Sequence, residues 1–320
     1  MARSRHVDDV LAATADPAAP ARSFVAASWW RSVAVHGLDP ANDKPPNTLG
    51  DAALRTVLER SGPLLAAAGQ SLDRLFKAVG DAGCCILLTD HQGVPLVRRG
   101  VAADDETFHR WGLWPGAVWS EASEGTNGIG TCIAEQRALV IHRDQHFHAR
   151  NTGLSCTVAP VHDHVGRLAG AVDVSSARAD LVEPMLGMLT VCVTDAARRI
   201  EATMFRQAFP QARIVLAPGP DRGAPSLLAL DHDDLVIGAT REARLALKLD
   251  DEILARRIPA GALLDREQDD RAAPLEAAER AALRRALARS NGNVSAAAAL
   301  LGVSRATLHR KMKRLAVPRI

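Results

Sequence analysis

Apolar residues recur at every third or fourth position over several stretches of the chain, which is the spacing that aligns them on one face of a helix. This spacing predicts a helix over residues 23–36, one or two helices over residues 49–80 with a break at Gly62-Pro63, and a long helix over residues 180–205. Residues 1–48 contain only the first of these, and we expect them to form an N-terminal helical segment.

Short apolar runs bounded by turn residues indicate strands in the middle of the chain. They cover residues 84–89, 94–98, 139–142, 155–162 and 167–175. The sequences Asp90-His-Gln-Gly93 and Asp163-His-Val-Gly166 are typical of the turns that join such strands. The pattern therefore predicts an antiparallel sheet flanked by helices, an α+β domain over residues 49–207.

The last 46 residues show a third pattern, two short helical stretches separated by a turn. Asn293 or Ser295 can cap a helix that runs through Leu301. Gly302 supplies the backbone freedom of a tight turn, and Ser304 can cap a second helix through Leu315. The positions expected to face inward are Val294, Ala298, Leu301, Val303, Leu308, Met312 and Leu315. Crossed helices of this kind are typical of a helix-turn-helix.

The distribution of charge along the chain supports the helix-turn-helix interpretation. Residues 275–320 carry ten Lys or Arg against two acids, a net charge of +8, whereas the whole chain is only +2 and its first 274 residues are therefore at about −6. A cationic end on an acidic body suits a polyanion such as double-stranded DNA. We expect the first turn of the second helix to enter the major groove and its later cations to reach phosphates. The predicted DNA-binding residues are Ser304, Arg305, Thr307, His309, Arg310, Lys311 and Lys313. The alternative is an alanine-rich helical hairpin with a solvated basic face.

A further helix is predicted from about Pro274 to Ser290, with its apolar residues along one side. Because this three-helix core is small, we expect the segment to pair with its copy in a homodimer. The sequences Ser290-Asn-Gly-Asn-Val-Ser295 and Leu301-Gly-Val-Ser-Arg-Ala-Thr-Leu308 resemble the Fis-type helix-turn-helix that ends many bacterial enhancer-binding regulators. The resemblance implies an all-α DNA-binding domain over residues 275–320, which reads two half-sites about one DNA turn apart as a dimer.

Residues 23–205 carry a second resemblance. Its motifs include Ser28-Trp-Trp-Arg31, Glu124-Gly-Thr-Asn-Gly-Ile-Gly-Thr131, Gly153-Leu-Ser-Cys-Thr-Val-Ala-Pro160 and Gly170-Ala-Val-Asp-Val-Ser175. They are similar to the sensory half of acetoin-catabolism regulators, which implies a GAF domain. The segment from Ser226 resembles the opening of a PAS domain, which would be truncated over residues 208–264 and followed by a linker over residues 265–274.

The chain departs from that family in one respect. Acetoin-type regulators usually carry an ATPase module between the sensor and the DNA-binding domain, yet the sequence has no Gly-x-x-x-x-Gly-Lys-Ser/Thr phosphate loop. Without this cradle and its lysine we expect no ATP hydrolysis. The resemblance therefore implies a regulator that is not an enzyme and that activates by recruiting RNA polymerase or represses by occlusion. The alternative is a redox-active GAF enzyme of the methionine-sulfoxide-reductase type.

The GAF-like region also holds candidate contacts for a small organic effector. Three tryptophans cluster within nine residues, and they would either enclose a ligand or fill the core. His146 and His148 alternate as on a strand, which would also suit a metal or haem site, but no ligand spacing is diagnostic. The predicted effector-binding residues are Trp111, Trp119, Thr126, Asn127, His146 and Cys156. We assign no cofactor, metal ligand or catalytic residue.

Composition sets the remaining expectations. The sequence contains no run of eighteen apolar residues and no evident signal peptide, so we expect no contact with a membrane. Its five cysteines form no Cys-x-x-Cys pair and are most simply reduced thiols. Both observations favour the cytoplasm.

Overall fold

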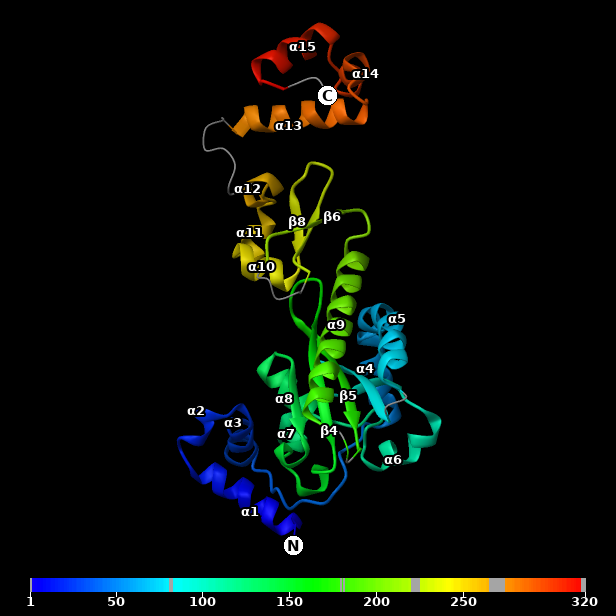
Figure 1. The fold of residues 1–320 in the computed structure, drawn as a ribbon, viewed down its shortest axis with the longest axis vertical. Helices are drawn as coiled ribbons and strands as arrows, with labels where there is room; N and C mark the ends of the chain where they lie inside the picture. Colours follow the sequence, from blue (N-terminus) through cyan, green and yellow to red (C-terminus); the bar gives the residue numbers. More distant parts are fainter. Residues whose placement is uncertain are drawn as a thin grey trace. The chain divides into compact units, whose positions relative to one another are not determined.

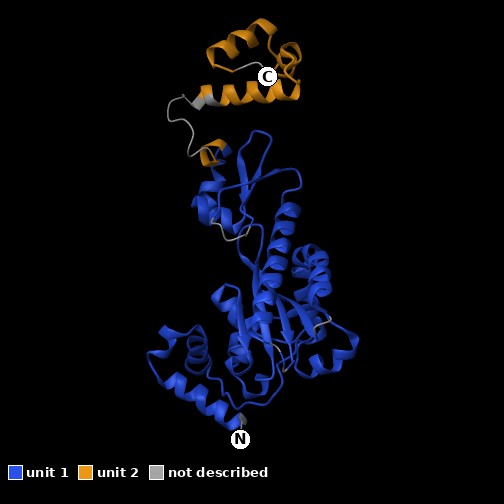
Figure 2. Ribbon diagram, viewed as in Figure 1, with its two compact units in different colours: residues 1–260 blue, residues 261–320 orange. Residues whose placement is uncertain are grey.

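The computed structural model describes residues 2–80, 83–178, 180, 182–219, 225–264 and 274–317. Figure 1 shows their helices and strands along the chain. They divide into two compact units, Met1–Ala260 and Gly261–Ile320, which Figure 2 shows in blue and orange. In the described part of the chain, no helix combines the length and the apolar character that crossing a lipid bilayer requires.

A five-stranded antiparallel sheet is the centre of the first unit. Its strand order is β2-β1-β5-β4-β3, so that β5 lies in the middle. The strands are β1 (Cys84–Asp90), β2 (Pro95–Arg99), β3 (Leu139–His142), β4 (Ser155–His162) and β5 (Leu168–Ser176). The five predicted strands are thus confirmed to within two residues, and so is the α+β class.

Two aspartates hold the hairpin turns of this sheet. Asp90 Oδ1 accepts hydrogen bonds from the backbone N–H groups of Gln92 and Val94, each at 2.9 Å. Asp163 Oδ1 binds the N–H groups of Val165 and Arg167 in the same way, also at 2.9 Å. Both turns contain a glycine with positive φ, Gly93 at 82° and Gly166 at 84°. Local side-chain hydrogen bonds of this kind explain why the turns could be read from the sequence.

Two helices cover one face of the sheet. They are α5 (Gly62–Val79) and α9 (Glu183–Ala208), which lie side by side in Figure 1 and bury the larger of the two sheet cores against β1, β4 and β5. A shorter helix, α4 (Asp51–Arg60), precedes α5, and the chain breaks between them at Ser61 and Gly62. The predicted helices over residues 49–80 and 180–205 are therefore confirmed, with the second shifted by about three residues.

The opposite face is covered by short helices and by the N-terminal residues. The helices of the middle region are α6 (Asp105–Arg110), α7 (Glu121–Glu124) and α8 (Gly128–Glu135), with 3-10 turns at Ala102–Asp104 (η3), Arg143–Gln145 (η4) and Ala149–Asn151 (η5). The N-terminal elements are α1 (Ala2–Ala15), α2 (Ala19–Arg22), α3 (Phe24–Trp30) and a π-helical turn, Arg31–Val35 (η1). The expectation of a single helical stretch in residues 1–48 is therefore wrong.

Hydrogen bonds and partly buried ion pairs join these N-terminal helices to the sheet domain. Ser28 Oγ donates to Glu121 Oε2 at 2.8 Å, and Arg31 Nε donates to Glu121 Oε1 at 2.6 Å. Arg31 also bonds Glu135 at 2.9 Å. Because Glu121 is buried and lies on α7, these contacts make α3 part of the layer that covers this face.

The rest of the first unit is a small sheet with strand order β6-β7-β8. Its strands are β6 (Arg213–Leu216), β7 (Leu227–Leu230) and β8 (Val236–Ala239), followed by α10 (Arg241–Leu247) and α11 (Asp251–Ala255). Phe205, near the end of α9, packs against Leu227 and Ala229 of β7. The segment from Ser226 onwards thus forms a strand, a turn, a second strand and a helix. Its assignment to a PAS domain stays a prediction.

The second unit begins within the short helix α12 (Ala260–Leu264). Its apolar core is enclosed by α13 (Pro274–Arg289), α14 (Val294–Leu300) and α15 (Arg305–Arg314). Its buried members are Leu283, Ala286, Leu287, Ala297, Ala298, Leu308, Met312, Leu315 and Val317. The predicted linker over residues 265–274 lies outside the described residues, except for Pro274, which begins α13.

Candidate functional site

Two side-chain caps and one glycine fix the geometry of the helix pair α14–α15. Asn293 Oδ1 accepts from the N–H groups of Ser295 at 3.0 Å and Ala296 at 3.2 Å, which begins α14. Ser304 Oγ accepts from the N–H of Thr307 at 3.1 Å, which begins α15. Gly302 between them has a φ of 63°, a conformation that costs other residues about 1 kcal/mol. Asn293 is therefore the cap of the first helix.

The predicted outward face of α15 is cationic but narrower than expected. Arg305, Arg310 and Lys313 are exposed and have no ion-pair partner among the described residues. Thr307 and His309 are half-buried beside them. These five residues begin in the first turn of the helix, where a protein helix can reach base edges in a major groove.

Lys311, by contrast, forms an ion pair within the protein. Its ammonium group and the guanidinium of Arg314 both bond the carboxylate of Glu279 on α13. The hydrogen bond from Lys311 is the main cause that lowers the pKa of Glu279 below its usual value. Because Glu279 is 32 residues away in sequence, this partner could not be read from the periodicity of α15. The contact reduces the positive charge that the last turn of α15 can offer to a phosphate.

Most of the predicted effector-binding residues are buried and bonded to other protein groups. Trp119 is 1% exposed, and its Nε1 donates to the carbonyl of Gly112 at 2.7 Å, so this tryptophan belongs to the core. Thr126 Oγ1 donates to Ser28 Oγ at 2.7 Å. Asn127 caps α8, since its Oδ1 accepts from the N–H of Gly130 at 2.8 Å. The polar groups of these residues thus hold α7, α8 and α3 together.

The expected strand at His146 and His148 is not present. Both residues lie between the 3-10 turns η4 and η5, so the alternation that would point them the same way does not apply. His146 Nδ1 is 3.0 Å from the carbonyl of Arg143, and its Nε2 is 3.5 Å from Cys156 Sγ. Burial lowers the pKa of His146 to about 4, so its ring is neutral at neutral pH. In the described chain neither histidine joins a cluster of three potential metal ligands.

Asp173 is a buried acidic residue that the sequence analysis did not single out. It lies on the central strand β5, on the same face as Ser175 and the neighbouring Cys156. Its Oδ2 accepts from Ser175 Oγ at 2.7 Å, and its Oδ1 has no partner in the described chain. Burial raises the pKa of Asp173 to about 7. In the sequence, this buried acid is indicated by one acidic residue inside the apolar run Gly170-Ala-Val-Asp-Val. It stands at a position where the alternation of side chains along the strand predicts one that faces inward.

The cysteines of this face have thiol pKa values above the usual value. Burial raises the pKa of the Cys85 thiol to about 12, and it raises the pKa values of Cys132 and Cys156 as well. A thiol reacts as its thiolate, so a raised pKa lowers its nucleophilicity and its rate of oxidation at neutral pH. This environment disfavours the redox-enzyme alternative.

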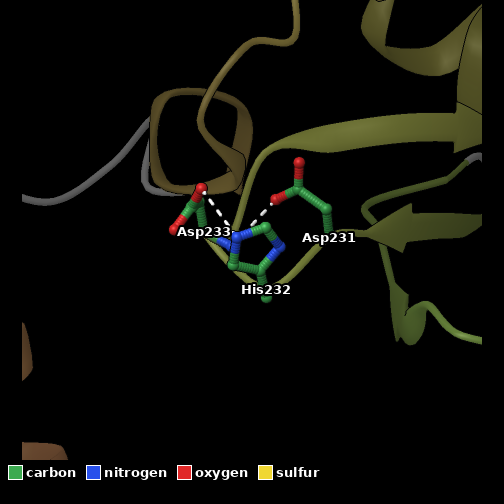
Figure 3. A group of neighbouring side chains, drawn as sticks. All are labelled: Asp231, His232 and Asp233. Atoms are coloured by element: carbon green, nitrogen blue, oxygen red, sulfur yellow. Dashed lines mark hydrogen bonds and ion pairs between the residues drawn. The ribbon is translucent and has the colours of Figure 1, made fainter.

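One group of three potential metal ligands occurs among the described residues. Asp231, His232 and Asp233 form the turn between β7 and β8, as Figure 3 shows. Asp231 Oδ1 already accepts from the N–H groups of Asp233 at 2.9 Å and Leu235 at 3.0 Å. The His232 side chain is 88% exposed and pairs with Asp233. The geometry is that of a hydrogen-bonded hairpin turn, and we assign it no metal.

Trp111 differs from the other predicted effector contacts because it lines an open groove. The groove has a volume of about 720 Å³. Its other lining residues are Arg3, Asp43, Pro45, Pro46, Arg110, Arg150 and Asn151. Trp111, one of the six predicted effector-binding residues, therefore lies on the wall of this groove.

Known proteins match the chain in two regions. Residues 63–200 match the GAF domain, and residues 274–315 match the family described as bacterial regulatory protein, Fis family. Residues 201–273, which separate the two regions, are too few for the ATPase module of acetoin-type regulators.

Two curated relatives carry regulatory names. The acetoin catabolism regulatory protein of Cupriavidus necator is 33% identical over 255 residues, which are 76% of this chain and 38% of that protein. The acetoin dehydrogenase operon transcriptional activator AcoR of Bacillus subtilis is 29% identical over 181 residues, 57% of this chain and 30% of that protein. The chain thus spans well under half the length of these relatives.

A solved structure has a related fold. The Escherichia coli DhaR(N)–DhaL complex matches with a TM-score of 0.53 at 15% identity, over 71% of this chain and 77% of that chain. At this identity the likeness shows the fold alone. The two matched regions and the curated relatives together show that the chain joins a GAF domain to a Fis-type helix-turn-helix and is a distant homologue of the acetoin catabolism regulators.

Proposed function

We propose that this protein is a sequence-specific DNA-binding regulator of transcription whose GAF domain binds a small-molecule effector. The observation that carries the proposal is the exposed cationic face of α15, with Arg305, Arg310 and Lys313, on a capped helix pair of the Fis family. Arg305 lies in the first turn, the part of a recognition helix that reads base edges. The later cations suit phosphates, which would give affinity without sequence preference.

Dimerisation is part of the proposal. Leu275, at the start of α13, is 80% exposed, and Ala278 one turn later is exposed as well. Further along the same helix, Leu283 and Leu287 are buried in the core of the second unit. The uncovered apolar residues at the start of α13 suit pairing with the same helix of a second copy. Two copies would present two α15 helices to successive half-sites.

Helix α9 is the element best suited to transmit an effector signal. It packs along β4 and β5 of the GAF sheet, and near its end Phe205 packs against the small β6–β8 sheet. A ligand that shifts the sheet face would change the position of this helix, and so the spacing of the paired recognition helices. Because the sequence contains no ATP-binding loop, we propose regulation by recruitment of RNA polymerase or by occlusion. The names of its relatives make a catabolic operon the proposed target.

Competition binding tests the proposed function. Full-length protein is titrated against fragments of the promoter beside its own gene and against random duplex of equal length at moderate ionic strength. A regulator should prefer one promoter fragment by about 1,000-fold or more over random DNA. Equal binding to every fragment, in the presence and absence of small organic compounds, would refute the proposal.

A further inference from the structure

One side of α9 carries exposed apolar residues that the fold leaves uncovered. Met188 and Val191 are 70% and 69% exposed, and Met185 is 38% exposed. On the opposite side of the same turns, Leu189 and Val193 are buried in the sheet core. A helix that is apolar on both sides is normally covered on both sides. This half of α9 therefore offers a surface to a protein partner.

The exposed residues of α9 follow the spacing of a seam between two helices. Met185, Met188, Cys192, Asp195 and Arg199 are separated by three, four, three and four positions. This repeat keeps side chains on one stripe that can face a second helix over several turns. Cys192 is half-buried and the other four residues are exposed. These five residues, the α9 stripe, are thus accessible to a partner helix.

A shallow groove of about 150 Å³ lies beside the α9 stripe, between α5 and α9. Ser71 and Ala78 of α5 and Cys192 and Ala196 of α9 are among the residues that line it. Because these side chains are small, a second helix can approach closely and seat its side chains in the groove, as knobs enter holes in a coiled coil.

The charges of the stripe match a second copy of the same helix. Asp195 and Arg199 lie one turn apart and pair at 2.6 Å within the chain. In a parallel pair of α9 helices, Asp195 of each copy would lie beside Arg199 of the other, and apolar residues would face apolar residues. An antiparallel pair centred on Cys192 would instead set the charge of Arg199 against the apolar Met185, which costs free energy. The stripe therefore favours parallel pairing.

The size of the contact at α13 also indicates a second one. The uncovered apolar residues there are Leu275 and Ala278. Two side chains cover far less than the roughly 800 Å² per partner that a stable interface buries. The α9 stripe is longer, since its residues extend over about 21 Å of helix.

We propose that a second copy of this chain covers the α9 stripe, so that two α9 helices pack in parallel with their Cys192 residues face to face. This inference rests on the proposed function, of which the dimer is a part, and it adds a second contact to that of α13. Each contact alone is too small to hold the copies together at micromolar concentration, so loss of either shifts the protein towards monomer. Because α9 also packs along β4 and β5, the contact joins the two GAF domains through the helix proposed to transmit the signal.

Cys192 makes the contact testable by crosslinking of the full chain. It is half-buried, whereas the other four cysteines are buried. A disulfide requires two Cα atoms within about 7 Å of each other, which a parallel α9 pair provides at this position. Mild oxidation with copper phenanthroline should therefore give a covalent dimer on a non-reducing gel, and Cys192→Ser should give none. A natural chain that sediments as a dimer but forms no crosslink would overturn the proposal.

Variants of the stripe test its packing. Met188→Glu places two carboxylates in the seam and should weaken dimerisation at least about 100-fold in sedimentation equilibrium. Val35→Glu, at a 61% exposed position outside α9, is the matched control and should leave dimerisation unchanged. Equal dimerisation of the two variants would refute the α9 contact.

Charge reversal tests the parallel direction. Arg199→Asp leaves only acids at this level of both helices and should weaken dimerisation by about tenfold. The further change Asp195→Arg restores opposite charges between the copies and should restore dimerisation. A double variant as weak as Arg199→Asp alone would contradict the parallel pairing.

Promoter preference is measured on the same samples, so that the two proposals are judged separately. A chain that crosslinks through Cys192 but binds every DNA fragment equally would refute the proposed function and leave the α9 contact in place. A chain that prefers one promoter fragment but forms no crosslink would refute the α9 contact and leave the proposed function in place.

Discussion

Asp173 places a carboxyl group on a buried face of the central strand, beside Ser175. The apolar pattern predicts the strand but not the burial of this residue, because an acid inside an apolar run is also compatible with an exposed position. Whether it is buried depends on α8, whose Gly128 lies against the neighbouring Cys156: a Cβ atom there would be 2.5 Å from Cys156 Cβ. The burial of the tryptophans likewise depends on tertiary packing. Trp119 and Trp111 are alike in sequence terms, yet one fills the core and the other lines a groove.

The pKa of Asp173 predicts a pH dependence of stability. Burial raises this pKa from 3.8 to about 7, so the folded chain holds a proton that the unfolded chain releases above about pH 4. This group therefore makes the folded state lose stability as the pH rises from about 4 to about 7. Asp173→Asn cannot titrate. Its unfolding free energy minus that of the natural chain should rise by on the order of 2–4 kcal/mol between these pH values.

Urea unfolding at several pH values measures this difference. Burial lowers the pKa values of His146 and His148 to about 4, which acts in the opposite direction, but both histidines are present in both chains and cancel. Asp195→Asn, at an exposed position of α9, is the matched control. A difference that stays constant from pH 4 to pH 8 would contradict the prediction.

Arg305 allows a second prediction at the residue scale. Because it is exposed in the first turn of α15, Arg305→Ala should weaken binding to the preferred promoter fragment by about 1–3 kcal/mol and relax the preference among bases. Lys313→Ala, later on the same face, should weaken binding to all sequences alike and lower the slope of log affinity against log salt by about 1. Anisotropy titrations at several salt concentrations separate the two effects. If Arg305→Ala kept both affinity and preference, the proposed groove geometry would be wrong.

At the scale of elements, local signals were sufficient for most helices and strands. The two hairpin aspartates, the caps Asn293 and Ser304, and the alternation of the strands are all interactions between residues close in sequence. Helix α1 was missed because its own apolar pattern is weak. Its buried residues are His6 and Val10, and His6 Nε2 lies 3.3 Å from the carbonyl of Phe147, a partner 141 residues away.

The contact between α13 and α15 predicts a gain in DNA affinity. Glu279→Gln removes the carboxylate that neutralises Lys311 and Arg314, so both cations become available to phosphates. Affinity should rise for all sequences alike, and the salt slope should steepen by about 1–2. Glu276→Gln, on the same helix, changes the net charge equally and is the control. Equal effects of the two variants would show that net charge alone is responsible and that the pairing has no part in it.

At the scale of the whole molecule, the proposed dimer depends on the start of α13. Leu275→Glu should shift the protein from dimer to monomer in sedimentation equilibrium and lower affinity for a two-half-site fragment far more than for a single half-site, because the two copies no longer bind together. Leu245→Glu, the control, changes a leucine that is 60% exposed on α10. This variant should remain a dimer and keep its affinity for the two-half-site fragment. A stable dimer of the Leu275→Glu protein would place the dimer contact elsewhere.

The sequence by itself determined the helix-turn-helix, its cationic face and the five strands of the GAF sheet. The reason is that caps, turns and periodic apolar positions act between residues a few places apart, so their signals are written within short segments. Only the tertiary structure decided that Lys311 pairs with Glu279, that Trp119 is core, and that Trp111, Arg150 and Asn151 meet in one groove. Burial and pairing of this kind depend on segments that only folding brings together.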